Sequence, residues 1–345
     1  MFNKKIFIIF ILLKFISIET LCKEIKISIR EIGVEEARSE DEKPYQFYII
    51  DSIDCDKYGN IYVLDSKEPC VKVFDKDGMF IRKLFREGKG PNEIANPYKV
   101  AINKFTGNLF VLHEHGYYLK EFDSSGNYVK HYPLPEQIMY YFEFIDKDRI
   151  LYIFHGRPRG KTYNNFKILN LKTLKIEKEF FQTDREFVIN GIMRFVVKDG
   201  ILWTCPGDEM RLICFDLKTG KKLNSIPIEE NYKKYKIRRG PNWVSATLYN
   251  FAQPISINEK IFILLTKIEY YKEETSEDFR NPKAHKLSLY YLDNDHLNKI
   301  RELPEGNFMY LGTVWENRII LYRHEPFPKI RILELKNMQL KRGKN

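Results

Sequence analysis

One pattern of residues recurs six times along this 345-residue chain and limits its fold more than any other feature. In each copy, short β-branched or aromatic runs alternate with turns of Gly, Asn and Asp. The clearest copies occupy residues 53–78 and 100–127. Runs joined by such turns predict antiparallel hairpins, and four runs per copy predict a four-stranded meander. Six meanders predict a closed ring: an all-β, six-bladed β-propeller of four-stranded antiparallel blades.

The blades are predicted to form one domain over residues 23–345, because no linker or change of composition divides this part. Their approximate limits are 47–85, 98–133, 140–181, 192–228, 253–303 and 309–341. Turns such as Asp75–Gly78 combine an Asp that caps the turn with a Gly that supplies positive φ. Blade 6 has only a thin outer strand near Met338–Leu340. We therefore expect the alternating segment Ile25–Arg30 to close the ring against blade 6, since an open ring exposes an edge.

The first 22 residues predict a signal peptide. Lys4 and Lys5 precede an apolar run, Ile6–Ile18, that is shorter than the roughly 20 residues of a membrane-spanning helix. The expected location is the periplasm or the cell surface. Cys22 has two interpretations: it lies beside a signal-peptidase cleavage site, or it becomes the lipid-modified first residue of a lipoprotein. In the second case this lipid would be the only membrane attachment.

Composition and charge limit the classes of partner that this chain is expected to bind. The net charge of +10 is spread along the chain, as on a solvated surface, and export argues against nucleic acid as the partner. A glycan, a peptide or an envelope protein is expected instead. Four cysteines follow the signal peptide: Cys55, Cys70, Cys205 and Cys214. Neither neighbouring pair lies opposite in the predicted register, so buried or free thiols are expected.

Three segments of blades 1 and 2, at 56–65, 73–78 and 85–93, resemble NHL-type six-bladed propellers. The closest resemblance is to exported bacterial six-bladed β-propeller proteins, which are often lipoproteins. It implies a propeller without a general enzymatic activity. Two related enzyme groups, the peptide-amidating lyases and the gluconolactonase-like propellers, carry metal ligands at their innermost strands. Here the starts of those strands have no His, and Asp51 is the one acidic candidate.

A candidate metal site emerges when the blades are aligned at their second strands. The residues that follow those strands include Asp65, His113, His155, Cys205 and His324. These corners would face one mouth of the central channel, and His, Asp and Cys are ligands of Zn²⁺. A divalent metal would then be the cofactor of a metal-dependent lyase or hydrolase. The competing interpretation is a set of solvated strand ends around a ring too wide for the ~2 Å reach of one ion.

The long connectors at the same mouth form a candidate ligand-binding face, because cationic and aromatic residues interleave there. The candidate residues are Lys89, Tyr98, Arg157, Arg159, Arg238, Arg239 and Trp243. Loops held on a rigid scaffold commonly carry binding, and aromatic and Arg side chains suit sugar rings and carboxylates. The alternative is ordinary solvated loops. The function predicted first is an exported, non-catalytic ligand-binding or protein-interaction propeller, without catalytic residues or cofactor; the metal enzyme is the alternative.

Overall fold

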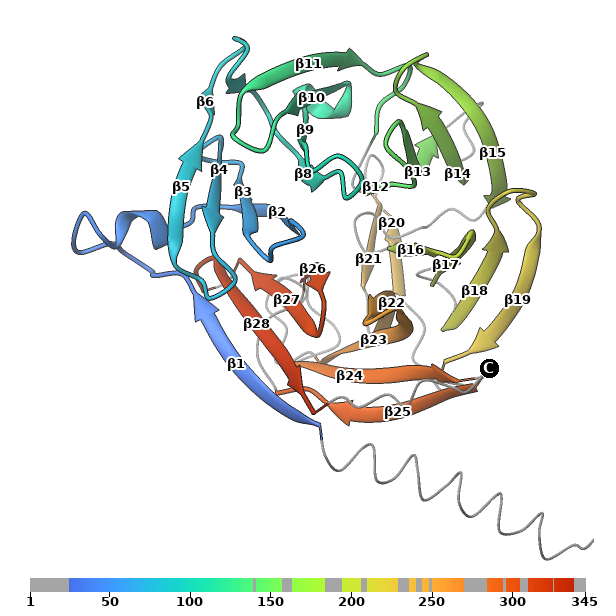
Figure 1. The fold of residues 1–345 in the computed structure, drawn as a ribbon. Coiled ribbons are helices and arrows are strands. Elements are labelled where there is room, and N and C mark those ends of the chain that lie inside the picture. Colours follow the sequence, from blue (N-terminus) through green and yellow to red (C-terminus); the bar gives the residue numbers. More distant parts are fainter. Residues whose placement is uncertain are drawn as a thin grey trace, which may run out of the picture.

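The structure is a computed structural model of the chain. It describes residues 25–138, 141–156, 163–183, 194–205, 210–228, 236–239, 244–247, 250–269, 284–293, 296–304, 310–324 and 326–337. These residues form six four-stranded sheets arranged in a ring (Figure 1). The predicted six-bladed propeller is confirmed. No helix in the described part of the chain is long and apolar enough to cross a membrane.

Each blade is antiparallel, and its strands run from position A at the ring centre to position D at the rim. Blades 1 to 3 comprise β2 (Ile50–Cys55), β3 (Ile61–Asp65), β4 (Cys70–Phe74) and β5 (Phe80–Leu84); β8 (Lys99–Ile102), β9 (Leu109–His113), β10 (Tyr118–Phe122) and β11 (Tyr128–Pro133); and β12 (Phe142–Phe144), β13 (Arg149–Gly156), β14 (Tyr163–Asn170) and β15 (Lys175–Thr183).

Blades 4 to 6 repeat this arrangement. They comprise β16 (Phe195–Lys198), β17 (Ile201–Thr204), β18 (Arg211–Asp216) and β19 (Lys222–Pro227); β22 (Asn250–Ile257), β23 (Lys260–Glu269), β24 (Ala284–Asp293) and β25 (His296–Glu302); and β26 (Tyr310–Trp315), β27 (Arg318–Arg323), β28 (Lys329–Lys336) and β1 (Lys26–Ile32). Four short strands lie in the connectors: β6 (Arg86–Glu87) with β7 (Glu93–Ile94), and β20 (Lys236–Arg239) with β21 (Val244–Thr247). Two 3₁₀ turns, Lys43–Tyr45 and Glu114–Gly116, complete the described elements.

The ring closes through the N-terminal strand. β1 pairs with β28 from Lys26 opposite Lys336 to Ile32 opposite Ile330. The predicted closure by this segment is therefore confirmed, and β1 itself occupies position D of blade 6. The predicted outer strand near Met338–Leu340 lies outside the described residues. The pairing joins the start of the ring to its end. β1 covers the outer edge of β28, which would otherwise be open.

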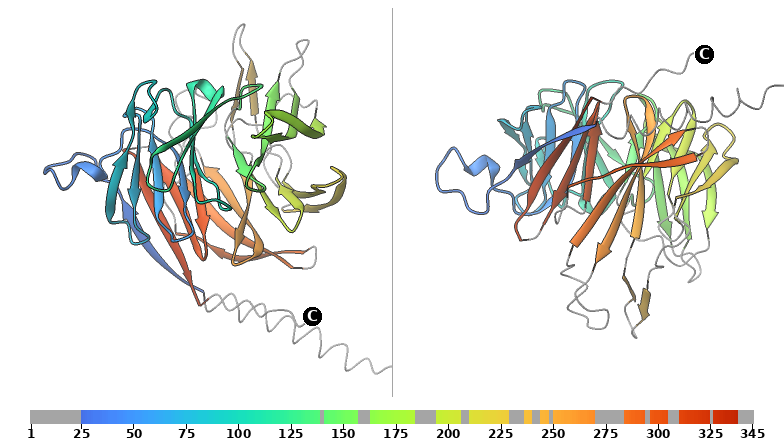
Figure 2. Two further views of the ribbon diagram at one scale, coloured as in Figure 1. Left: turned by 45° about the horizontal axis from the view of Figure 1, so that its top comes forward. Right: turned by 90° about the horizontal axis from the view of Figure 1, so that it is seen from below.

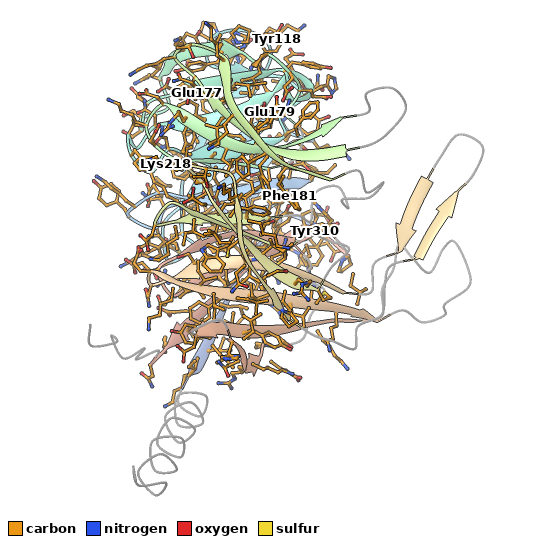
Figure 3. The ribbon with its side chains drawn as sticks, turned by 90° about the vertical axis from the view of Figure 1, so that its right-hand side faces the viewer. Tyr118, Glu177, Glu179, Phe181, Lys218 and Tyr310 are labelled. Carbon is orange, nitrogen blue, oxygen red and sulfur yellow. The ribbon has the colours of Figure 1, made fainter. Side chains whose placement is uncertain are left out.

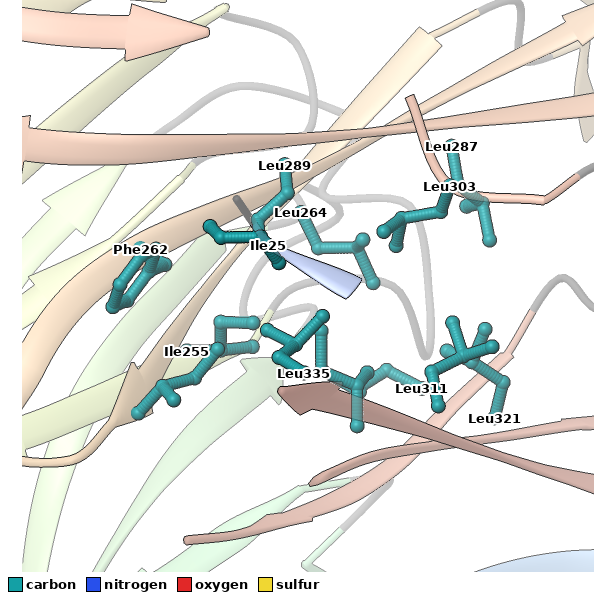
Figure 4. Close-up of a cluster of buried hydrophobic side chains, with 13 residues drawn as sticks. Ile25, Ile255, Phe262, Leu264, Leu287, Leu289, Leu303, Leu311, Leu321 and Leu335 are labelled. Atoms are coloured by element: carbon teal, nitrogen blue, oxygen red, sulfur yellow. The ribbon is translucent and has the colours of Figure 1, made fainter. Parts of the chain in front are cut away.

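The core is divided among the contacts between blades. Six clusters of buried side chains lie within the described residues, one at each contact between neighbouring blades. Strand B explains this division because its two faces meet different blades: Ile61 and Val63 pack toward blade 6, whereas Tyr62 and Leu64 pack toward blade 2. Figure 4 shows the cluster between blades 5 and 6, which includes Ile25, the residue before β1. Each such side chain contributes about 1.5–3 kcal/mol when fully buried.

The ring has two faces (Figure 2). The A–B and C–D turns form one, called the turn face here; the B–C loops and D–A connectors form the other, the connector face. The predicted turn chemistry is confirmed at Asp75, whose carboxylate accepts the backbone N–H groups of Asp77 and Met79 at 2.8 and 2.9 Å. Gly78 follows with φ 83°. All four described cysteines are buried free thiols, as predicted.

Candidate functional site

Two of the predicted ligand-binding residues on the connector face are described with their side chains. The Lys89 side chain is 85% exposed, and its Nζ lies 3.8 Å from Glu114 Oε1. The Tyr98 hydroxyl is 3.3 Å from His115 Nδ1. Both side chains are accessible, and the structure brings them to the same connector region of blade 2. Their role in ligand binding stays a prediction.

The other predicted ligand-binding residues lie in longer connectors. Arg238 and Arg239 belong to β20, whose hairpin with β21 extends beyond the ring of blades (Figure 3), but their side chains are outside the described set. Arg157, Arg159 and Trp243 lie outside the described residues altogether, as does Cys22 with the whole predicted signal peptide.

Among the predicted metal ligands, Asp65 accepts hydrogen bonds from the backbone of the segment that leads into its own blade. It is fully buried, and its two carboxylate oxygens accept the backbone N–H groups of Tyr48 and Ile49 at 2.8 and 3.1 Å. Its Oδ2 also lies 4.0 Å from Lys72 Nζ. A carboxylate with these donors holds the connector that enters blade 1.

His113 is buried at the end of strand B of blade 2. Its ring lies 5.3 Å from that of His131 and 6.0 Å from that of Tyr118. Neither ring nitrogen has a hydrogen-bond partner in the described part of the chain. Burial, together with the charges of Lys120 and His131, lowers the pKa of His113 to about 3. The imidazole is therefore neutral at physiological pH.

The remaining metal candidates have separate surroundings. Cys205 packs in the cluster between blades 4 and 5, where burial raises its thiol pKa. His324 lies against Tyr310 and Tyr322 of blade 6, with ring centres 5.0 and 5.7 Å away. The side chain of His155 is outside the described set. Across the described residues, no group of three or more His, Cys, Asp or Glu residues could hold a metal ion. A site that includes His155 stays a prediction.

The ring centre holds a charged cavity that the sequence analysis missed. This channel cavity, of about 60 Å³, lies between the inner strands of five blades. Its charged lining residues are Asp54, Lys99, Lys104, Glu143 and Arg194. They come from different repeats, and the repeat pattern itself marks the A strands as ordinary short β-segments. The available signal was a charged residue at or just before the start of an inner strand, as at Lys99 and Arg194.

Asp54 ties three blades together in this channel. Its Oδ2 accepts the backbone N–H of Ile102 in blade 2 at 2.8 Å, and its Oδ1 accepts the hydroxyl of Thr313 in blade 6 at 3.0 Å. Oδ1 also accepts the N–H of Cys55 at 2.8 Å. The Asp54 carboxylate therefore stabilises the contacts of blade 1 with blades 2 and 6.

Arg194 and Tyr141 form a second polar group in the channel. The Arg194 guanidinium donates to the backbone carbonyls of Gly312, at 3.0 Å, and Leu311, across the channel in blade 6. It also lies over the Tyr141 ring, 4.9 Å from its centre. The Tyr141 hydroxyl donates to Glu143. Burial raises the pKa of Tyr141, and the carboxylate of Glu143 raises it further, so the phenol stays protonated.

Lys99 stands apart among these charges. It is 7% exposed, and its ammonium lies 4.6 Å from the centre of the Tyr141 ring and 5.6 Å from that of Phe142. Burial, with the charge of Arg194, lowers the pKa of Lys99 to about 8, although the carboxylates of Asp54 and Glu143 act to raise it. Cation–π contacts are worth about 0.5–2 kcal/mol and replace only part of the lost hydration.

A larger cavity of about 590 Å³ lies on the turn face, formed mainly by the A–B turns of blades 1, 2, 5 and 6. This mouth cavity shares Ile102 and Lys104 with the channel cavity. Tyr58, 68% exposed, and Trp315 supply aromatic surface to its wall. Polar groups surround these rings, including the side chain of Glu259. The cavity lies on the face opposite to the one that the sequence analysis favoured.

The position of Trp315 is fixed by a glycine. Gly59, in the A–B turn of blade 1, has φ 85°, and a Cβ placed on it would lie 2.7 Å from the indole ring. Arg318 covers the same ring, 5.3 Å from its centre. Gly59 therefore permits both the left-handed turn and the close approach of Trp315 to the backbone.

Comparison with protein families supports the architecture. Residues 42–206 match the DUF5128 family, which is described as a 6-bladed beta-propeller. The match covers blades 1 to 3 and the inner half of blade 4. It confirms the six-bladed part of the predicted resemblance, and the NHL-type assignment stays a prediction. A comparison with curated proteins finds no match.

Solved structures share the fold at low sequence identity. A member of the DUF4221 family from Bacteroides vulgatus has a TM-score of 0.61 at 13% identity, over 91% of this chain and 98% of its own. A Bacteroides fragilis protein named as a candidate exported protein has a TM-score of 0.54 at 10% identity, over 90% of this chain and 95% of its own. The WD40 repeats of RRP9 have a TM-score of 0.53 at 9% identity, over 91% of this chain and 100% of their own. These identities show the fold alone.

Proposed function

We propose that this chain is an exported, non-catalytic propeller that binds a ligand in the mouth cavity. The observation that carries the proposal is the cavity of about 590 Å³ walled by Tyr58 and Trp315. Its volume lies in the range of about 300–1,000 Å³ that is usual for small-molecule sites. The structural neighbour from Bacteroides fragilis supports export through its name.

The lining favours a saccharide-sized ligand. Flat aromatic surfaces suit the apolar faces of sugar rings, and the polar side chains around them suit hydroxyl groups. Asp56, Asn103 and Asn258 line the same wall. The A–B turn of blade 1 is held by its own side chain: Asp56 Oδ1 accepts the N–H groups of Tyr58 and Asn60 at 2.8 and 2.9 Å. Binding would therefore require little ordering of the protein.

Glycan arrays probed with the purified protein test this function. We expect Trp315→Ala to lose at least tenfold in affinity for any glycan that the wild type binds, because the stacking surface is removed. Tyr128→Ala is the matched control, since Tyr128 is exposed on the rim strand of blade 2 and lines neither cavity. Equal losses in the two variants would refute the mouth cavity as the site.

The connector face gives the competing location for the same function. A triple variant, Arg238→Ala with Arg239→Ala and Trp243→Ala, removes the predicted ligand-binding residues there. If this variant loses glycan or peptide capture while Trp315→Ala retains it, binding belongs to the connector face.

A further inference from the structure

The ammonium of Lys99 is a buried cation without an anionic partner in the described part of the chain. It is 7% exposed, and no hydrogen-bond acceptor or ion-pair partner contacts it within the described residues. Its contacts are the faces of Tyr141 and Phe142. Buried charges in proteins are normally paired, because burial without a partner costs several kcal/mol. Lys99 lines the channel cavity, so its partner can be a ligand.

Arg194 supplies a second cation beside the same ring. Both Lys99 Nζ and the Arg194 guanidinium carbon lie within 5 Å of the centre of the Tyr141 ring, at 4.6 and 4.9 Å. Two of the five guanidinium N–H groups are used by the carbonyls of Leu311 and Gly312. Among the residues that the structure describes, the other three have no hydrogen-bond acceptor and can donate to a group in the cavity.

The acidic residues of the channel do not neutralise this pair. The carboxylate of Asp54 accepts donors from Cys55, Ile102 and Thr313, and that of Glu143 accepts the Tyr141 hydroxyl. Neither approaches Lys99 or Arg194 closely enough for an ion pair. The cavity lining therefore carries three cationic side chains, Lys99, Lys104 and Arg194, against the two carboxylates of Asp54 and Glu143.

The size of the channel cavity limits the ligand group. About 60 Å³ holds roughly two water molecules, at about 30 Å³ each. A carboxylate is small, planar and anionic, and it matches a guanidinium beside an ammonium. The channel cavity adjoins the mouth cavity at Ile102 and Lys104, which line both.

We propose that the recess between Lys99 and Arg194 binds the carboxylate of the ligand whose body occupies the mouth cavity. The ligand class is then an acidic sugar or a related organic acid. This inference rests on the proposed function for the body of the ligand, whereas the carboxylate recess can be tested alone.

Acetate and its neutral counterpart acetamide are the probes. The thermal unfolding midpoint is measured at pH 7 and constant ionic strength, with sodium chloride as the balancing salt. Acetate should raise the midpoint of the wild type and of Lys222→Met, whose lysine is exposed on the rim strand of blade 4 and lines neither cavity. It should leave Lys99→Met unchanged, and acetamide should have no effect on any of them. The acetate effect should fade as pH rises above about 8, when the amine of Lys99 loses its proton.

Equal acetate shifts in the wild type and Lys99→Met would overturn the proposal, as would equal shifts with chloride and acetate in the wild type. If Lys99→Met does not fold, a crystal structure of the wild type grown with acetate decides. A carboxylate within hydrogen-bond distance of Lys99 Nζ supports the proposal, and water alone at that position overturns it. A positive acetate result with unchanged glycan binding by Trp315→Ala would retain the recess and reject the mouth cavity.

Discussion

Two kinds of buried lysine in this propeller have similar burial and opposite surroundings. Lys72, Lys120 and Lys167 lie on strand C of blades 1, 2 and 3, and Lys99 lies on strand A of blade 2. All four are no more than 7% exposed. The strand C lysines all have oxygen partners. Lys99 has two aromatic rings and a cavity. Burial alone therefore does not distinguish a lysine that holds the fold from one that awaits a ligand.

The strand C lysines hold the connectors. Lys72 Nζ donates to the carbonyl of Gln46 at 2.5 Å, and Lys120 Nζ donates to those of Gly90 and Glu93 at 2.7 and 2.6 Å. In blade 3, Lys167 Nζ donates to the carboxylate of Glu136 at 2.8 Å, and it also pairs with Glu179 of its own blade. The backbone carbonyls and Glu136 lie in the segments that lead into the lysines' own blades. These lysines replace their lost water with partners that the repeat brings into place.

The largest effect is expected from Lys120→Met. The substitution removes two charge-assisted hydrogen bonds and leaves two backbone carbonyls without their donor. We expect the free energy of unfolding to fall by about 2–4 kcal/mol. Urea unfolding monitored by circular dichroism measures this free energy of unfolding. A loss below about 0.5 kcal/mol would show that water replaces the ammonium and that the connector needs no lysine.

His113 sharpens the comparison, because it is buried without a hydrogen-bond partner among the described residues yet lines neither cavity. Its pKa in the folded protein is about 3, against an ordinary value of 6.5, so the unfolded chain binds more protons between these pH values. Stability should therefore fall as pH drops from about 6.5 to 3, by about 3 kcal/mol at pH 4. The surrounding charges are Lys120 and His131. His113→Phe should lose less stability over this range in urea titrations; an unchanged pH profile would assign the effect to other groups.

Lys99→Met should act in the opposite direction to Lys120→Met. Removing a buried cation without an anionic partner should raise the free energy of unfolding at pH 7 by about 1–2 kcal/mol. The pKa of Lys99 is about 8 in the folded protein and 10.5 ordinarily, so the unfolded state holds more protons between these values. Wild-type stability should thus gain from this group as pH rises from about 8 to 10.5, and the advantage of the variant should shrink. Destabilisation of Lys99→Met in ligand-free urea unfolding would contradict this account.

The smallest expected effect concerns the wall of the mouth cavity. Gly59→Ala and Gly107→Ala both place a side chain at positive φ, at 85° and 81°, which costs about 1–2 kcal/mol in each. A Cβ at Gly59 also meets the Trp315 ring, whereas nothing lies within 4 Å of one at Gly107. Gly59→Ala should be less stable than Gly107→Ala by about 1 kcal/mol and should shift Trp315 fluorescence. Identical unfolding and emission would mean that the indole ring moves freely.

The sequence alone determined the ring and its turns. Asp75 and Gly78 show why: a turn is made by residues within a few positions of each other, so its chemistry is readable locally. The pairing of Ile25–Arg30 with blade 6 was also predictable, because a ring with an open edge is unfavourable and the segment alternates apolar and polar residues.

Only the tertiary structure decided which charged residues meet. Lys72 and Lys99 look alike in sequence, since each is a lysine beside the apolar residues of a short predicted strand. Their partners come from other segments: Gln46 lies 26 residues from Lys72, and Arg194 comes to Lys99 from another blade. Such contacts arise when six blades close around one axis. The repeat therefore specifies the scaffold, and the channel and mouth cavities exist only where the repeats converge.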